Sequence, residues 1–118
     1  MTELRIHVGE GPEAMGRRFV AAWRCAEAGE EVRERHLTFA TLQDAAKMLT
    51  PKRLELLRAI HRQPVRSVRA LAEALDRDYK NVHGDVRALT EAGLLDRDDL
   101  GGLVADYDAI AVEMAIAL

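Results

Sequence analysis

The chain has 118 residues, of which 48% are hydrophobic and 4% aromatic, and a net charge of −3. This length suits one domain with a small appendage, and its core would consist mostly of Leu, Ala, Val and Ile. Its apolar runs are too short to cross a membrane, and its first residues lack the pattern of a secretory signal. Because Cys25 is the single cysteine, no internal disulfide can form, so we expect a reducing, cytoplasmic setting.

The charge is unevenly distributed along the chain. Residues 1–50 have a net charge of −1, and residues 50–89 carry nine basic and five acidic side chains, a net charge of +4. Residues 90–118 carry one basic and seven acidic side chains, a net charge of −6. A basic segment is typical of a protein that binds a phosphate backbone. The alternative is that these charges form the solvated faces of ordinary helices.

The first forty residues predict a strand, a helix and a second strand. Apolar residues alternate with polar ones over residues 4–8 and 35–40, as in half-buried strands. Residues 13–28 show helical spacing of apolar side chains. This unit is too small to bury its own apolar face. The side chains that we expect to form a dimer or partner surface are Met15, Phe19 and Trp23. Packing beneath the two strands is the alternative for all three.

Four helices follow, over residues 41–49, 50–63, 67–75 and 78–93. Each begins at a residue whose side-chain oxygen can cap a helix N-terminus: Thr41, Thr50, Ser67 and Asp78. Pro51 fits the first position of the second helix, and Gly93 ends the fourth. The expected inward-facing residues of the middle two helices are Leu54, Leu57, Ile60, Val68, Leu71, Ala72 and Leu75.

Residues 94–107 predict a strand, a tight turn and a second strand, with Asp and Gly residues at 98–102 in the turn. Apolar residues then recur at every second position from Ile110 to Leu118, which predicts a final strand. An alanine-rich helix is the competing interpretation of that segment.

Three short helices followed by a two-stranded hairpin is the order of a winged helix-turn-helix. The sequence therefore predicts an α+β fold. In this fold, residues 41–118 form a winged helix-turn-helix DNA-binding domain, and residues 1–40 form a strand–helix–strand extension.

The last predicted helix has one apolar and one polar face. At about 100° per residue, Val82, Val86 and Leu89 form the core stripe. Asp85 lies toward the flank of that stripe, where we expect it to pair within the protein. The outward face consists of Lys80, Asn81, His83, Gly84 and Arg87. Glu91 also faces outward, but at the C-terminal end, whereas a recognition helix enters the major groove by its N-terminal part.

These residue types suit contacts with DNA. Lys80 and Arg87 can neutralise phosphates or reach guanine, and Asn81 can read adenine. The full set of candidate DNA-binding residues is Ser67, Arg69, Arg77, Asp78, Tyr79, Lys80, Asn81, His83, Gly84 and Arg87. Gly84 would allow the helix to approach a DNA backbone or a partner closely, and the alternative is a tolerated surface glycine. In the hairpin, Arg97 is the only basic residue and is surrounded by aspartates, so this wing is a poor phosphate binder.

The tract DRDYKNVHGDVRALTEAGLL, together with LTPKRLELLRAIHR and SVRALAEAL before it, resembles a family of predicted prokaryotic transcriptional regulators with a MarR-like winged helix. The resemblance covers residues 49–118 and implies a DNA-binding regulator that is often dimeric. It also implies recognition positions from Asp78 to Arg87. Some relatives are similar to antitoxins encoded beside a small toxin. Many relatives carry a basic residue where this chain has Gly84.

An enzyme is not expected, because the four histidines and Cys25 show no metal-ligand spacing and no glycine loop matches a phosphate cradle. We therefore expect a cofactor-free repressor that occupies a promoter as a homodimer. The rival hypothesis is an antitoxin-like module that neutralises a toxin protein, with or without DNA binding.

Overall fold

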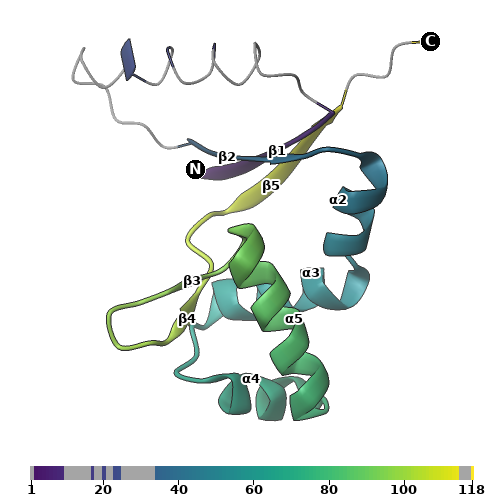
Figure 1. The fold of residues 1–118 in the computed structure, drawn as a ribbon. Helices are drawn as coiled ribbons and strands as arrows, with labels where there is room; N and C mark the ends of the chain where they lie inside the picture. The colour runs from purple at the N-terminus through teal and green to yellow at the C-terminus, as the bar shows by residue number, and fades with distance from the viewer. Residues whose placement is uncertain (1, 10–16, 18–19, 21–22, 25–33, 115–117) are drawn as a thin grey trace. The chain divides into compact units, whose positions relative to one another are not determined.

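The structure is a computed structural model that describes residues 2–9, 17, 20, 23–24, 34–114 and 118. Its elements combine helices and strands, so the predicted α+β class is confirmed (Figure 1). The chain divides into two compact units, one formed by residues 1–45 and 107–118 and the other by residues 46–106. Most of the predicted helix 13–28, including Met15 and Phe19, lies outside the described residues. Trp23 is described, and it is 60% exposed.

The first unit contains a three-stranded parallel sheet. Strand β1 (Glu3–Val8) lies in its middle, with β2 (Glu34–Phe39) on one side and β5 (Ala109–Met114) on the other (Figure 1). All three strands were predicted, and the strand interpretation of the C-terminal segment is confirmed over Ala109–Met114. The sequence-based division at residue 40 grouped this segment with the helices, whereas β5 pairs with β1.

The two faces of β1 differ in chemistry. Leu4 and Ile6 are fully buried, and Val8 is 7% exposed, on one face. On the other face His7 is 5% exposed, and its Nε2 atom lies 2.8 Å from Nδ1 of His36 on β2. The two imidazole rings stack with their centroids 5.1 Å apart. The parallel pairing of β1 and β2 therefore brings together two histidines that lie 29 residues apart in the sequence.

Helices α2 (Leu42–Met48) and α3 (Pro51–Arg62) begin at the predicted caps. The Asp44 amide donates to Oγ1 of Thr41 over 3.1 Å, and the Arg53 amide donates to Oγ1 of Thr50 over 3.3 Å. These bonds satisfy amide groups that have no partner within the first turn of a helix.

Helices α4 (Val68–Leu75) and α5 (Tyr79–Ala92) are joined by a three-residue turn (Figure 1). Asp76 ends α4 in the left-handed region at φ 51°, and Gly93 ends α5 at φ 89°. An αL residue at the end of a helix lets the last carbonyls accept hydrogen bonds from the cap. The short turn is what places the N-terminus of α5 beside α4.

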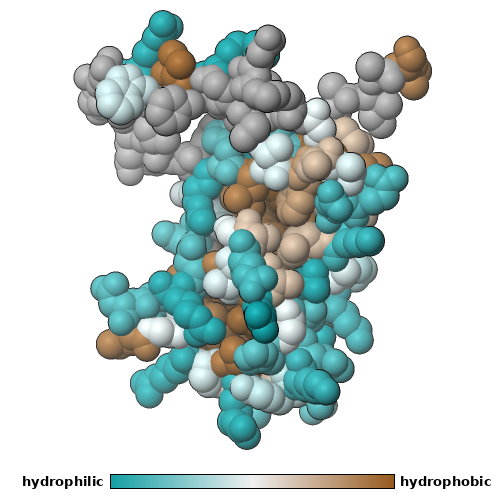
Figure 2. Space-filling view, in the orientation of Figure 1, coloured by the Kyte–Doolittle hydropathy of each residue, from teal (hydrophilic) through white to brown (hydrophobic). Residues whose placement is uncertain are grey.

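The hairpin consists of β3 (Asp96–Arg97) and β4 (Leu103–Val104), which pair antiparallel. The Asp98 carboxylate accepts hydrogen bonds from the Leu100 and Gly102 amides, and so holds the predicted turn. A bridge between Leu103 and Val65 ties the hairpin to the segment between α3 and α4. Figure 2 shows apolar atoms at the hairpin tip, where Leu100 is 95% exposed.

The core of the second unit is aliphatic. Its buried members are Leu56, Leu57, Ile60, Val68, Leu71, Ala72, Val82, Val86, Leu89, Leu94, Leu95, Leu103 and Ala105. The sequence correctly predicted most of these residues, but it placed Leu54 and Leu75 on the inward faces, where both are partly exposed, and it did not include Leu56, which is fully buried. The buried stripe of α3 is therefore formed by Leu56, Leu57 and Ile60, and it is rotated about the helix axis relative to the predicted stripe. No described helix is long and apolar enough to span a membrane.

Candidate nucleic-acid interface

Helix α5 has the two faces that its sequence predicted. Val82, Val86 and Leu89 are at most 2% exposed and anchor the helix to the core of its unit. All the residues assigned to the outward face are exposed: Lys80, Asn81, His83, Gly84, Arg87 and Glu91. From the start of the helix to Arg87 this face carries hydrogen-bond donors and a glycine, without a carboxylate.

Two capping side chains lie at helix N-termini, Asp78 at the start of α5 and Ser67 at the start of α4. The Asp78 carboxylate accepts a hydrogen bond from the Asn81 amide over 3.2 Å, and Oγ of Ser67 accepts one from the Ala70 amide over 3.1 Å. The hydroxyl proton of Ser67 is still available to donate to a phosphate. Asp78 therefore serves the helix as a cap, and its negative charge makes it a poor direct partner for DNA.

An exposed cluster joins the N-terminal ends of α4 and α5. The Arg69 guanidinium lies over the Tyr79 ring, 5.1 Å from its centroid, and the Tyr79 and His83 rings are 5.8 Å apart. Tyr79 is 45% exposed. A cation held over an aromatic face gains about 0.5–1 kcal/mol at an exposed site. The cluster thus places three potential phosphate or base donors close together at the N-terminal end of α5.

Arg77 is partly buried and pairs with Asp85. Its Nη2 atom lies 2.9 Å from one oxygen of Asp85, and Nε of Arg53 lies 3.0 Å from the other. The three side chains are between 18% and 20% exposed. The expectation that Asp85 pairs within the protein is confirmed. The sequence analysis assigned Arg77 to a DNA contact and did not predict this pair.

The same pair sets the pKa of Asp85. Burial alone would raise the pKa of this carboxyl group, because a charge is poorly solvated in the interior. The hydrogen bonds from Arg77 and Arg53, together with the positive charges of these two residues, more than offset burial. The pKa of Asp85 is therefore lower than that of an ordinary aspartate, and the group is ionised at neutral pH.

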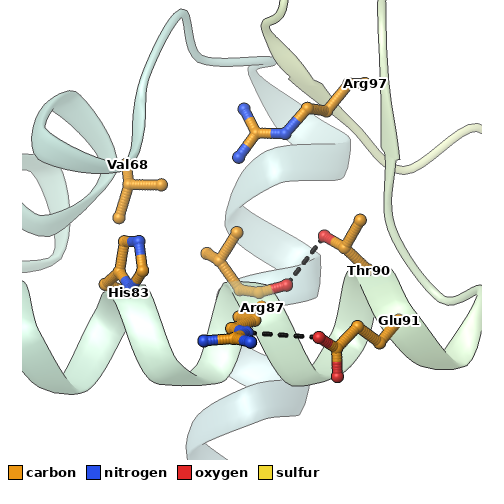
Figure 3. A pocket seen from close by; sticks show the side chains of 7 residues that line it. Val68, His83, Arg87, Thr90, Glu91 and Arg97 are labelled. Carbon is orange, nitrogen blue, oxygen red and sulfur yellow. Dashed lines mark hydrogen bonds and ion pairs between the residues drawn. The ribbon is translucent and has the colours of Figure 1, made fainter.

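A shallow pocket of about 330 Å³ lies between α5 and the hairpin (Figure 3). Its lining residues are Val68, His83, Val86, Arg87, Thr90, Glu91 and Arg97. Arg97 faces the hollow from the hairpin side, and His83 lines it from α5 (Figure 3). The Arg97 Nη1 group also donates to the Gly101 carbonyl over 2.9 Å. The structure thus brings the single basic residue of the hairpin beside the basic face of α5.

Arg87 forms an ion pair with Glu91, one helical turn further on, over 3.1 Å (Figure 3). Both side chains are about 70% exposed, at 74% and 68%. An exposed pair of this kind is worth about 0–1 kcal/mol, so Arg87 can exchange Glu91 for a phosphate at little cost.

Sequence reasoning missed the contacts that depend on tertiary structure. Arg97 comes from β3 and Val68 from α4, whereas His83 and Thr90 come from α5, and the sequence spacing does not predict that the three elements share a pocket. The Arg69–Tyr79 contact likewise spans two helices. The Nδ1 atom of His61 lies 2.9 Å from the Ala105 carbonyl oxygen. Among the described residues, no three His, Cys, Asp or Glu side chains gather as a metal site would require.

Comparison with known proteins identifies the family. The HVO_A0114 family matches residues 48–112, more than half of the chain, and the chain belongs to this family. No curated protein and no solved structure matches it. The matched segment includes α3, α4, α5 and the hairpin, and therefore every residue of the candidate interface from Ser67 to Arg97.

Proposed function

We propose that residues 46–106 act as a winged helix-turn-helix and bind double-stranded DNA, with α5 as the recognition helix. Three helices followed by an antiparallel hairpin support this proposal, as does the three-residue turn between α4 and α5. The bridge between Val65 and Leu103 adds support, since it fixes the hairpin beside the helices as a wing requires. The fold alone does not establish a function, so the proposal depends on the side chains of α5.

The observation that carries the proposal is the exposed face of α5. Lys80, Asn81 and His83 occupy the N-terminal half of the helix, where a recognition helix meets base edges, and all three are exposed. The N-terminus of a helix also carries a partial positive charge that favours phosphate. This face carries no carboxylate before Glu91, and so it would not repel the phosphates that line a DNA groove.

Each contact has a distinct chemical role. Asn81 can pair with both N6 and N7 of adenine, while Lys80 and Arg87 can neutralise phosphates or reach guanine acceptors. The Arg69–Tyr79 cluster and the Ser67 hydroxyl would contact the DNA phosphate backbone at the N-terminal end of α4 and so position the duplex. Arg97 adds one cation from the wing, although the neighbouring aspartates limit its attraction for phosphate. The predicted DNA contacts therefore come mainly from the helices.

The biological role that follows is transcriptional regulation, most simply repression by occupying a promoter, without a cofactor. A homodimer of MarR-like regulators would read two half-sites about one helical turn or a multiple apart. The first candidate for a regulated gene is the gene that encodes this protein.

The proposal is tested by titrating the full chain against the duplex immediately upstream of its gene and against a scrambled duplex, at two salt concentrations. We expect tighter binding to the upstream duplex and weaker binding to both duplexes at higher salt. A protein that binds neither duplex, at low salt as well as high, would argue against DNA binding. That result would favour the antitoxin-like alternative, in which the chain binds a protein.

A further inference from the structure

The outer edge of β5 is open in the described part of the chain. Strand β1 pairs with β5 along all six residues from Ala109 to Met114, and no described strand pairs with the opposite side of β5. The edge of a sheet presents a row of backbone N–H and C=O groups that can pair with another strand. Among the described residues, the backbone groups on this side of β5 are therefore left for pairing with another strand.

One face of β5 is apolar and incompletely covered. Its residues Ile110, Val112 and Met114 lie in register with Leu4, Ile6 and Val8 of β1, so the six side chains share one face of the sheet. The β1 residues are at most 7% exposed, whereas Val112 is 51% and Met114 is 42% exposed. The apolar face of the sheet thus continues to its edge and ends there in contact with solvent.

β5 also lacks the features by which natural edge strands avoid pairing. Such strands commonly carry lysine, proline, a bulge or an inward-pointing charge. The sequence of β5, AIAVEM, contains one charged residue, Glu113, and its carboxylate is already bonded to Arg5 of β1. The other outer strand, β2, has the sequence ERHLTF, with three ionisable residues in its first half. The two edges of the sheet are therefore not equivalent.

We propose that β5 pairs antiparallel with β5 of a second copy of this chain, around a two-fold axis at Val112. In this register Val112 lies opposite Val112 of the second copy, and Ile110 lies opposite its Met114. On the other face Ala111 lies opposite Glu113 of the second copy, so no like charges oppose each other. Directly opposed residues in an antiparallel pair point to the same face, so the apolar face stays continuous.

A second copy suits this edge better than an unrelated strand. The two-fold pairing satisfies the edges of both copies at once and turns two three-stranded sheets into one continuous sheet. It also covers the exposed parts of Val112 and Met114 with the same residues of the other copy, as an isologous interface requires. The proposal concerns the sheet and does not rest on DNA binding by α5.

The test is the oligomeric state of the full chain, measured by sedimentation equilibrium over a range of concentrations. We expect the unaltered protein to form dimers. Val112→Lys and Val112→Glu each place two like charges opposite each other, so each should weaken association by about tenfold or more. An equimolar mixture of the two variants should restore dimers, because the opposed charges then attract. Leu100→Lys, in the exposed hairpin tip, serves as the control and should leave association unchanged.

Several outcomes would overturn the proposal. These are a monomer at every soluble concentration, dimers that both Val112 variants leave intact, and variants that fold but do not associate when mixed. Circular dichroism shows whether each variant folds. If neither folds, amide hydrogen exchange of the unaltered protein decides between the possibilities. We then expect the β5 amides to become protected as dimers form, and exchange in β5 that is independent of concentration would contradict the pairing.

Discussion

The carboxylate of Asp85 and the guanidinium of Arg77 meet at 2.9 Å, and this contact joins α5 to the turn that precedes it. The second carboxylate oxygen of Asp85 accepts from Arg53 of α3, whose Nη1 group also donates to the carbonyl of Lys47 over 3.1 Å. One aspartate therefore connects three elements of the helical unit. Its position holds the N-terminal part of α5, from which the proposed DNA contacts project.

Replacing Asp85 should destabilise the helical unit. Asp85→Asn leaves two largely buried guanidinium groups without their counter-charge. Removing one partner of a buried ion pair costs about 3–5 kcal/mol, and we expect about 3 kcal/mol because the Asp85 side chain is still 18% exposed. Urea unfolding measures the change. Asp99→Asn, in the exposed hairpin turn, is the control and should change stability by less than about 0.5 kcal/mol. Equal stability of the two variants would contradict this assignment.

The same carboxylate predicts a pH dependence. Because the pKa of Asp85 is lower in the folded protein than in the unfolded chain, ionised Asp85 stabilises the fold above the ordinary aspartate pKa, about 3.9. That contribution should be lost as the pH falls through the lowered folded pKa. The difference in free energy of unfolding between the unaltered protein and Asp85→Asn should therefore be largest near neutral pH and shrink in acid. A difference that stays constant with pH would contradict the pKa direction.

Gly84 gives a prediction with two readouts. A Cβ atom at this position would meet nothing within 4 Å, so Gly84→Ala should stabilise the interior of α5 by up to about 1 kcal/mol. If DNA approaches the backbone of α5 at this point, the added methyl group should weaken DNA binding at the same time. Thermal unfolding measures the first effect and a DNA titration the second. Increased stability with unchanged affinity would identify Gly84 as a tolerated surface glycine.

Gly102 should respond in the opposite way. A Cβ atom there would lie 2.8 Å from Oδ2 of Asp98 and 3.1 Å from the Val65 carbonyl oxygen. Because the Asp98 carboxylate holds the hairpin turn, Gly102→Ala forces either the turn or the Val65 segment to move, at a cost of about 1–3 kcal/mol. Urea unfolding of the two alanine variants should give shifts of opposite sign. A neutral Gly102→Ala would show that the hairpin turn adapts freely.

The local structure was largely predictable from the sequence. The caps Thr41, Thr50, Ser67 and Asp78 and the stop at Gly93 are chemical signals carried by single residues, and each marks an element boundary in the structure. The exposed and buried faces of α5 followed from its helical period. These features depend on residues within a turn or two of one another.

Features that depend on distant residues were not predictable in the same way. The pairing of β5 with β1 joins the two ends of the chain, and period-two alternation does not specify a partner strand. The burial of Arg77 depends on Arg53 and Asp85, which lie on separate helices. The pocket beneath Arg97 arises where the hairpin meets α5. In each case the missing information was tertiary packing rather than residue chemistry.

The central claim is that the outward face of α5 binds DNA. It is tested most directly by measuring the salt dependence of binding to the upstream duplex for the unaltered protein and two double variants. Lys80→Ala/Arg87→Ala removes two charges from α5, and Lys52→Ala/Arg58→Ala removes two exposed charges from α3. Our account predicts that the α5 variant loses affinity and that the magnitude of its salt slope falls by about two, while the α3 variant keeps nearly the slope of the unaltered protein. Equal losses in the two variants, or no salt-dependent binding by the unaltered protein, would contradict it.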